Sequence, residues 1–253
     1  MFVKKSFYFA GQQKDRASHF HGKDGLGDVA EIKQPNMSLL KDDHSSDALI
    51  QLTKEHPGEI TLVAIGPLTN VALACRLDPG FSSRLKNIVI MGGNIEGKGN
   101  VSVSGEFNFH HDPEAVHIVV NELTCPKQVV TWEVCLNHGF SWDFYEKYTN
   151  LGTKRSEFVR KITEKPAEFY RAKYRGMGDK YVSCDALAMA IALKPDAVLQ
   201  KKNVYATSEL HGKLTRGQMV VDWRGILKKE HNMTLIIQMN MDEVKKLFME
   251  SLY

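Results

Sequence analysis

The sequence has few cysteines, and they are poorly spaced for cross-linking or for binding zinc. Cys75, Cys125, Cys135 and Cys184 are the only four among 253 residues, and no two of them form a Cys-x-x-Cys pair. A disulfide framework or a cysteine-based zinc site would need a regular or closer spacing. The pattern is typical of buried, reduced thiols, and we expect the protein to be cytoplasmic.

Long apolar runs and a strong charge of one sign are also missing. The longest apolar stretches, such as residues 87–91, are too short to cross a bilayer, and the amino-terminal residues lack the apolar core of a signal peptide. The net charge is only +3 with histidine neutral, and the lysines and arginines are dispersed. We therefore expect neither a membrane nor a nucleic acid as a partner.

The composition that is present suits one globular domain over residues 1–253. Hydrophobic residues make up 43% and charged residues 25% of the chain, which is ordinary for a domain with one large core. We find no internal repeat and no low-complexity segment. The sequence predicts a single domain.

Apolar runs that resemble strands alternate with helical patterns from Gly58 onward. We expect strands at 60–65, 88–91, 128–131, 204–210, 218–223 and 233–238, and helices at 68–76, 112–120, within 141–178, at 185–193 and at 242–251. This order predicts an α/β fold with a mostly parallel sheet flanked by helices and a late pair of strands. Before it, only 2–10 resembles a strand, and 11–36 is expected to be a polar loop.

Four clusters of glycine and polar residues, at 66–70, 91–93, 99–100 and 105–108, lie within about forty positions and follow predicted strands. The carboxyl ends of parallel strands are where ligands bind in such sheets. Residues 92–98 match the spacing of a phosphate-binding loop, but Gly99 stands where that loop needs Ser or Thr. A dinucleotide fingerprint is absent, and the paired histidines at 19, 21, 110 and 111 are more typical of loop or core positions than of a metal site.

The order and spacing of these motifs resemble the inosine-uridine preferring nucleoside hydrolases. The matching motifs are Gly-Pro-Leu-Thr-Asn at 66–70, Met-Gly-Gly at 91–93, Gly-Asn at 99–100, Glu-Phe-Asn at 106–108 and Asp-Pro-Glu-Ala at 112–115, with weaker matches at 21–27, 216–218 and Asp222. The resemblance covers nearly the whole chain. It implies an open Rossmann-like sheet and hydrolysis of the N-glycosidic bond of purine and pyrimidine ribonucleosides, with Ca²⁺ clamping the ribose and positioning the attacking water.

The resemblance also implies a ribose site at Met91, Asn100, Glu106, Phe107 and Asn108. The carboxylate and amide oxygens would hold the ribose hydroxyls, and Met91 would form the floor of the pocket. Glu106 and Asn108 would share one face of an extended segment, with Phe107 pointing away. The structural alternatives are a loop-capping network for the polar residues and a core position for Met91.

The implied calcium ligands are the Asp185 carboxylate and the main-chain carbonyl of Thr69, which are both hard oxygen donors. A helix cap is the alternative role of Asp185. Many family members carry a histidine before this aspartate to protonate a leaving purine, whereas this chain has Cys184, a weak hydrogen-bonding group. Four further candidates for the leaving-group or base pocket are His21, Tyr170, Tyr174 and Tyr181.

One family motif is not found in this sequence. The family's first strand ends in Asp-x-Asp-x-x-x-Asp-Asp, and Asp42-Asp43 is no substitute for it. The absent aspartates supply most calcium ligands and the base that activates water, so Asp185 and Thr69 fall short of the roughly six to eight oxygens that calcium takes.

We therefore expect little activity, marginal folding and an exposed apolar sheet edge where the first strand-helix unit would lie. Two interpretations stay open: an incomplete isoform or gene product of an active hydrolase, or a non-catalytic protein that binds nucleosides or ribose. The family resemblance also implies a homo-oligomer.

Overall fold

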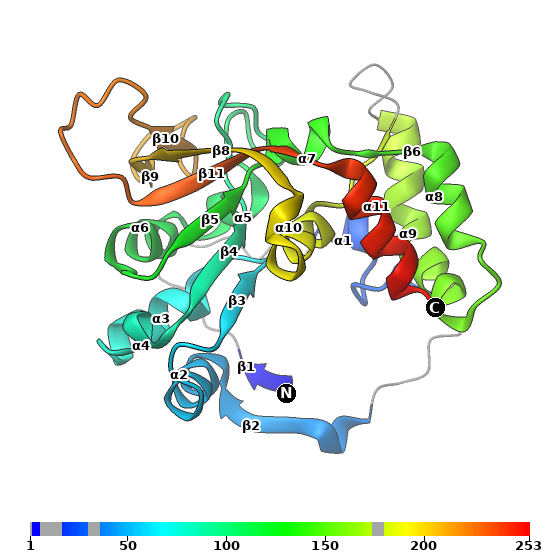
Figure 1. The fold of residues 1–253 in the computed structure, drawn as a ribbon, viewed down its shortest axis with the longest axis horizontal. Helices are drawn as coiled ribbons and strands as arrows, with labels where there is room; N and C mark the ends of the chain where they lie inside the picture. Colours follow the sequence, from blue (N-terminus) through cyan, green and yellow to red (C-terminus); the bar gives the residue numbers. More distant parts are fainter. Residues whose placement is uncertain (1, 6–16, 30–35, 174–179) are drawn as a thin grey trace.

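The computed structural model describes residues 2–5, 17–29, 36–173 and 180–253, and its centre is a five-stranded sheet (Figure 1). The strand order is β3–β4–β5–β11–β8. Strands β3 (Thr61–Ala64), β4 (Asn87–Met91), β5 (Lys127–Val130) and β11 (Met233–Met239) are parallel, and β8 (Val198–Val204) runs antiparallel to β11. The predicted α/β fold with a mostly parallel sheet is confirmed.

Helices cover both faces of this sheet, which is why its central strands are almost wholly apolar. Ile88 and Ile90 of β4 pack into one core with α3 (Thr69–Leu77) and α6 (Pro113–Glu122). Val89 and Met91 face the opposite core, which includes α10 (Cys184–Leu193). Helices α2 (Ser45–Glu55) and α4 (Phe81–Arg84) extend the first layer, and α7 (Trp132–Asn137) and α11 (Met241–Ser251) extend the second.

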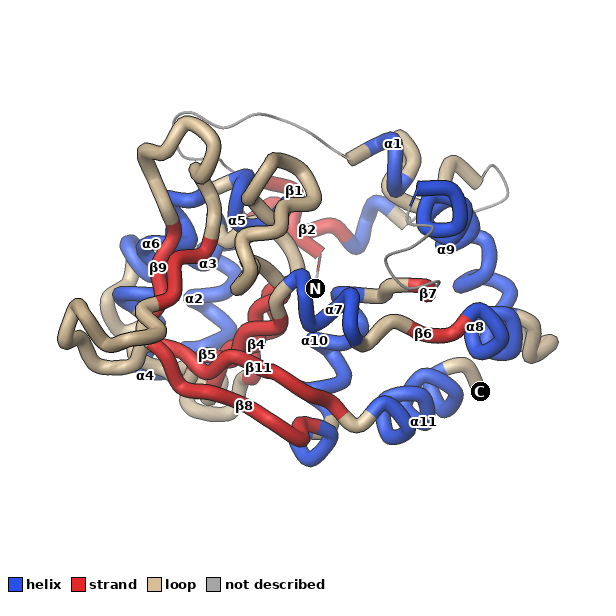
Figure 2. Tube along the Cα trace, turned by 90° about the horizontal axis from the view of Figure 1, so that it is seen from above, coloured by secondary structure: helices blue, strands red, loops and turns tan. Residues whose placement is uncertain are grey.

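A further group of helices lies beside the sheet (Figure 2). Helices α8 (Trp142–Thr149) and α9 (Lys154–Lys173) pack together, and the short α1 (Ser18–His21) rests on α9. Strands β6 (Phe140–Ser141) and β7 (Lys180–Tyr181) form a two-stranded antiparallel ladder beside them. Tyrosine rings fill the core of this region, including Tyr145, Tyr148 and Tyr181.

The remaining elements are short. Strand β1 (Phe2–Lys5) pairs with β2 (Leu40–His44), which follows a 3-10 turn at Met37–Leu39. Strands β9 (Ala206–Ser208) and β10 (Met219–Val221) form the predicted late pair, α5 (Phe107–His111) precedes α6, and a second 3-10 turn spans Pro195–Ala197. Among the helices of the described ranges, none is both long and apolar enough to cross a membrane.

The strand predicted at 204–210 corresponds to β9, whereas β8, which precedes it, was not predicted. The chain forms β8 at Val198–Val204 and then β9 at Ala206–Ser208. Strand β8 lies at the sheet edge, and its residues from 199 to 203 are exposed and mostly polar. Because an edge strand needs no apolar run, hydrophobic patterning did not reveal it.

The amino-terminal prediction was only partly correct. Strand β1 occupies Phe2–Lys5, and the rest of the predicted strand, residues 6–10, lies outside the described residues. Helix α1 falls within the predicted loop 11–36, and neither β2 nor α2 was predicted. Strand β3 is an edge strand of the sheet as described, and Ile65, directly after it, is 45% exposed.

Candidate active site

Glu106 is the centre of the polar cluster at the carboxyl ends of β3 and β4. It is the N-cap of α5 and only 1% exposed. Its Oε2 accepts hydrogen bonds from the backbone N–H groups of Gly93 (2.8 Å) and Phe109 (3.1 Å), and its Oε1 accepts one from Asn108 (2.9 Å). One carboxylate thus joins the loop after β4 to the start of a helix.

The predicted extended segment around Glu106 was wrong. Residues Phe107–His111 form α5, because the Glu106 carboxylate satisfies the free N–H groups of its first turn. Glu106 and Asn108 are both buried, while Phe107 is half-buried. The Phe107 ring lies 3.8 Å from the His111 ring, centroid to centroid.

Asn108 fixes the spacing of two strand ends. Its Nδ2 donates to the main-chain oxygen of Met91 at 3.0 Å and to that of Ile65 at 3.4 Å. The same nitrogen lies 3.4 Å from the Met91 sulfur. The side chains of Met91 and Asn108 therefore meet at the carboxyl ends of β3 and β4, where the sequence placed them.

The glycines of the Met-Gly-Gly motif are required by close packing. A Cβ at Gly92 would lie 2.7 Å from the Phe109 ring and 3.3 Å from Glu106 Oε2, and one at Gly93 would lie 2.8 Å from the same ring. Gly93 also has a φ of +71°, a conformation that favours glycine. The motif lets the loop approach the Glu106 carboxylate closely.

Asn100 lies farther out than the other predicted ribose-site residues. It is exposed, and its Oδ1 accepts a hydrogen bond of 2.8 Å from the Phe107 backbone N–H. The loop-capping alternative therefore describes its contact in this structure.

Thr69 and Asp185 differ in accessibility. Thr69 is buried, and its hydroxyl donates to Asp112 Oδ2 at 2.5 Å, while Asp112 also caps α6 through the Ala115 N–H. Asp185, in the first turn of α10, keeps much of its surface accessible to solvent. It was expected also as a helix cap, but the N-cap of α10 is Ser183.

The two carboxyl groups of the site are both held toward their neutral forms. Burial raises the pKa of Glu106 to about 7, despite three backbone hydrogen bonds that favour the anion, and the charge of Asp185 adds a smaller push. The protein atoms around Asp185 raise its pKa to about 6 although its side chain is accessible. No cation of the described residues offsets either shift. Across the described ranges, no group of three or more His, Cys, Asp or Glu side chains could hold a metal ion.

Cys184, the first residue of α10, lies beside the fully buried Cys135 of α7. The neighbouring Cys184 thiol adds to the burial that raises the pKa of Cys135, and the charges of Glu106 and Asp185 act in the same direction. Cys135 and Cys184 therefore belong to the surroundings of the two carboxylates. Sequence reasoning had singled out only Cys184.

The other base-pocket candidates are not brought to Glu106. His21 lies on α1, which packs against α9, and its ring contacts Phe20 at 4.6 Å. Burial, together with His19, lowers the pKa of His21. Tyr170 and Tyr181 are buried with their ring centroids 6.1 Å apart, so they act as core residues. Tyr174 lies outside the described residues.

Sequence reasoning missed several polar residues that build the site. Asn94 is fully buried and holds the loop after β4 through the carbonyls of Lys98 and Ser104. Glu133 accepts from the N–H groups of Ile95 and Glu96. In the sequence, each of the two appears only as a polar residue shortly after a predicted strand. Polar residues are common at such positions, so the pattern does not single these two out.

Three buried polar atoms near the strand ends have no hydrogen-bond partner among the described residues. They are Asn70 Oδ1 after β3, Thr131 Oγ1 after β5 and His111 Nε2 at the end of α5. Native proteins leave few buried polar atoms unpaired, and each calls for a partner such as water or a ligand. The site offers such a ligand both carboxylates and unused polar atoms.

Comparison with known proteins shows the family to which the chain belongs. The family model for inosine-uridine preferring nucleoside hydrolases matches residues 5–246. An inosine-uridine preferring nucleoside hydrolase from Leishmania major is 35% identical over 248 residues, which cover 93% of this chain and 73% of the relative. A hydrolase of the same description from Crithidia fasciculata is 32% identical, with the same shares covered. A solved inosine-guanosine nucleoside hydrolase superposes with a TM-score of 0.85 at 32% identity, covering 99% of this chain and 78% of that one.

Proposed function

Because the chain belongs to the inosine-uridine preferring nucleoside hydrolase family, we propose that it hydrolyses the N-glycosidic bond of purine and pyrimidine ribonucleosides to ribose and free base. The observation that carries the proposal is the buried Glu106 carboxylate, held by three backbone N–H groups beside Met91 and Asn108. The relatives named above are all described as hydrolases, which favours cleavage over the non-catalytic alternative.

Glycosidic cleavage builds positive charge on the ribose ring, so the site must orient the sugar and place negative charge near it. Glu106 is suited to this role because it is rigidly held and buried, where its interaction with developing charge is strong. We propose that Glu106, Asn108 and the exposed Asn100 bind the ribose hydroxyls. Met91 and Phe107 would supply the apolar walls of the sugar pocket.

The metal of the site is proposed to be Ca²⁺, with Asp185 and the main-chain oxygen of Thr69 as ligands. Calcium would hold ribose hydroxyls and the attacking water. Two donors do not make a calcium site, because calcium takes roughly six to eight oxygens. The residues described here thus do not fit the ion by themselves. We assign no residue as the base that activates water. We also assign no proton donor to the leaving base, although Cys184 and His21 stay candidates for that role.

Two further properties are proposals of the same kind. The four cysteines are free, which supports a reducing compartment such as the cytoplasm. The exposed edge of β3 and the exposed Ile65 would favour association of the chain with itself into a homo-oligomer. Size-exclusion chromatography with light scattering would test the second property.

The function is tested by incubating the purified chain with inosine, guanosine or uridine, in Ca²⁺ or in EDTA, and measuring released base and ribose. We expect slow release of base in Ca²⁺, in keeping with the incomplete set of ligands, and loss of that release in EDTA and in Glu106→Gln. Glu59→Gln, which changes an exposed glutamate, is the matched control. Ribose binding without release of base in any condition would contradict the proposed reaction and favour the binding protein.

The contribution of Asp185 to metal binding is tested separately by calcium titration calorimetry. Asp185→Asn should weaken Ca²⁺ binding by at least about tenfold, since it removes a charged oxygen ligand. Asp196→Asn, at an exposed position after α10, should leave binding unchanged. Equal calcium affinity in both variants would contradict the assignment of Asp185 as a ligand.

A further inference from the structure

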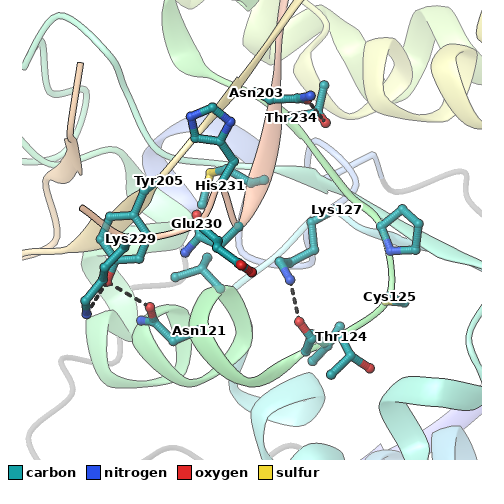
Figure 3. A pocket seen from close by; sticks show the side chains of 15 residues that line it. Asn121, Thr124, Cys125, Lys127, Asn203, Tyr205, Lys229, Glu230, His231 and Thr234 are labelled. Carbon is teal, nitrogen blue, oxygen red and sulfur yellow. Dashed lines mark hydrogen bonds between the residues drawn. The ribbon is translucent and has the colours of Figure 1, made fainter. Parts of the chain in front are cut away.

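An open cavity of about 830 Å³ lies at the sheet edge opposite Glu106, where β5 and β11 begin and β8 ends (Figure 3). Its walls come from the end of α6, the start of β5, the end of β8 and the segment before β11. The cavity is open to solvent over much of its extent, so it is a groove rather than an enclosed site. Nothing in the proposed hydrolysis uses this edge of the sheet.

Lys127 is the most deeply buried charged group of the cavity wall. It is 7% exposed, and its Nζ donates to the main-chain oxygen of Leu123, the C-cap residue of α6. An ammonium has three donors, and neither a second acceptor nor a carboxylate within 4 Å is found for Lys127 among the described residues. Burial lowers its pKa, as expected for a charge without a full partner.

The other polar groups of the cavity are mainly donors. Lys229 donates to the Tyr205 hydroxyl at 3.0 Å and lies 4.9 Å from the centre of the same ring. Asn203 accepts from Thr234 at 2.7 Å through its Oδ1, which leaves its amide nitrogen for a ligand. Glu230 is the one carboxylate in the wall, and it is exposed.

We propose that this cavity binds a phosphomonoester of nucleotide size, with the phosphate next to Lys127 and the remainder extending toward Lys229 and Tyr205. A phosphate dianion would offset the buried ammonium and accept its two unused hydrogens. In Figure 3 the side chains of Lys127 and Lys229 lie on opposite sides of the cavity, so a ligand that contacts both must extend across it. The volume and the second lysine therefore favour a larger anion.

A purely structural role for Lys127 gives a different expectation. As a cap of α6, it would stabilise the helix end and bind nothing. The two roles predict different effects of the Lys127 and Glu230 charges on the affinity for an added ligand. A binding role predicts that removing either charge changes affinity, with opposite signs for Lys127 and Glu230.

The test is calorimetric titration of the full chain with adenosine 5′-monophosphate, uridine 5′-monophosphate and inorganic phosphate. We expect a nucleotide to bind and Lys127→Met to weaken binding at least tenfold. Glu230→Gln should tighten it several-fold, because it removes a like charge from the cavity wall. Lys147→Met, at an exposed lysine of α8, is the matched control and should change nothing.

Further measurements distinguish a nucleotide from inorganic phosphate as the ligand, and they allow for a variant that does not fold. Equal binding of inorganic phosphate that is lost in Lys127→Met would support the anion site and assign free phosphate as its ligand. If Lys127→Met does not fold, Lys229→Met must weaken nucleotide binding at least threefold. No binding to the wild type, or affinities unchanged in both lysine variants, would overturn the proposal.

Discussion

The two edges of the central sheet carry charged groups of opposite sign. At the carboxyl edge, Glu106 caps α5, Asp112 caps α6 and Asp185 lies in the first turn of α10. At the amino edge, Lys127 donates to the main-chain oxygen of Leu123, the C-cap residue of α6. Helices in such a fold begin at the carboxyl edge of the sheet and end at the amino edge. The partial positive charge at the start of a helix favours acidic side chains at the carboxyl edge, and the partial negative charge at its end favours a basic side chain at the amino edge.

The helix ends do not fully compensate these charges. Burial raises the pKa values of Glu106 and Asp185 and lowers that of Lys127, so each group is pushed toward its neutral form. Under the two proposals above, each edge takes a ligand of the opposite charge: a cation near Asp185 and an anion near Lys127. The predictions below test whether the two edges really act in this separate way.

The largest expected effect is on the carboxyl edge. Glu106→Gln should lower kcat/KM for inosine by about 1,000-fold, or about 4 kcal/mol of transition-state stabilisation, because an amide carries no charge and its NH₂ cannot accept from backbone N–H groups. Base release and far-UV circular dichroism would be measured together. Unchanged kcat/KM in a folded variant would remove Glu106 from the ribose site.

The next effect concerns the loop that approaches Glu106. Gly93→Ala should destabilise the protein by about 4 kcal/mol, since it combines a left-handed φ with overpacking against Phe109. Gly58→Ala is the matched control, because Gly58 has a φ of +78° but no atom lies within 4 Å of the position that a Cβ would take. It should lose only the conformational part, about 1 kcal/mol. Equal losses in urea unfolding would contradict the packing argument.

The same comparison shows what sequence could predict. The Pro-containing start of α6 after Asp112 and the apolar run of β4 follow from local rules, because capping and burial on both faces leave direct patterns in sequence. The motif residues at 91–93 and 106–108 do come together. Their contacts could not be predicted in detail, since the helical turn at Phe107 depends on a Glu106 carboxylate that also binds Gly93, thirteen residues earlier.

The amino edge was not predicted at all. Lys127 begins a strand and resembles an ordinary polar boundary residue in the sequence. Its burial arises from long-range packing of β8, β11 and α6 around it, and β8 itself was not predicted. Similarly, Cys135 and Cys184 are 49 positions apart, and only the packing of α7 against α10 brings them together.

The third effect is a pH dependence that belongs to the carboxyl edge. Because the pKa of Glu106 is raised from 4.5 to about 7, the folded state holds a proton that the unfolded state releases between these values. Its stabilising contribution is present below pH 4.5 and is lost as pH rises to 7, by about 3 kcal/mol. Urea unfolding in EDTA from pH 4.5 to 7.5 should show this decline. Glu106→Gln should flatten it, and an equal decline in that variant would assign the effect to other groups.

The smallest effect tests the amino edge. Lys127→Met removes a buried charge but also the hydrogen bond to Leu123, so the free energy of unfolding at pH 7 should change by less than about 1 kcal/mol. Because the pKa of Lys127 is lowered, the unfolded state binds more protons above its folded value, and the wild type should gain stability relative to Lys127→Met as pH rises toward 10. The neighbouring Cys75 and Cys125 thiols, whose pKa values are raised, titrate in the opposite sense and interact with Lys127, so Cys75→Ser and Cys125→Ser are introduced into both proteins. The difference in the free energy of unfolding between the two proteins, measured as a function of pH, therefore reports the titration of Lys127. A difference that stays constant with pH would show that the charge of Lys127 does not respond to burial as that of Glu106 does.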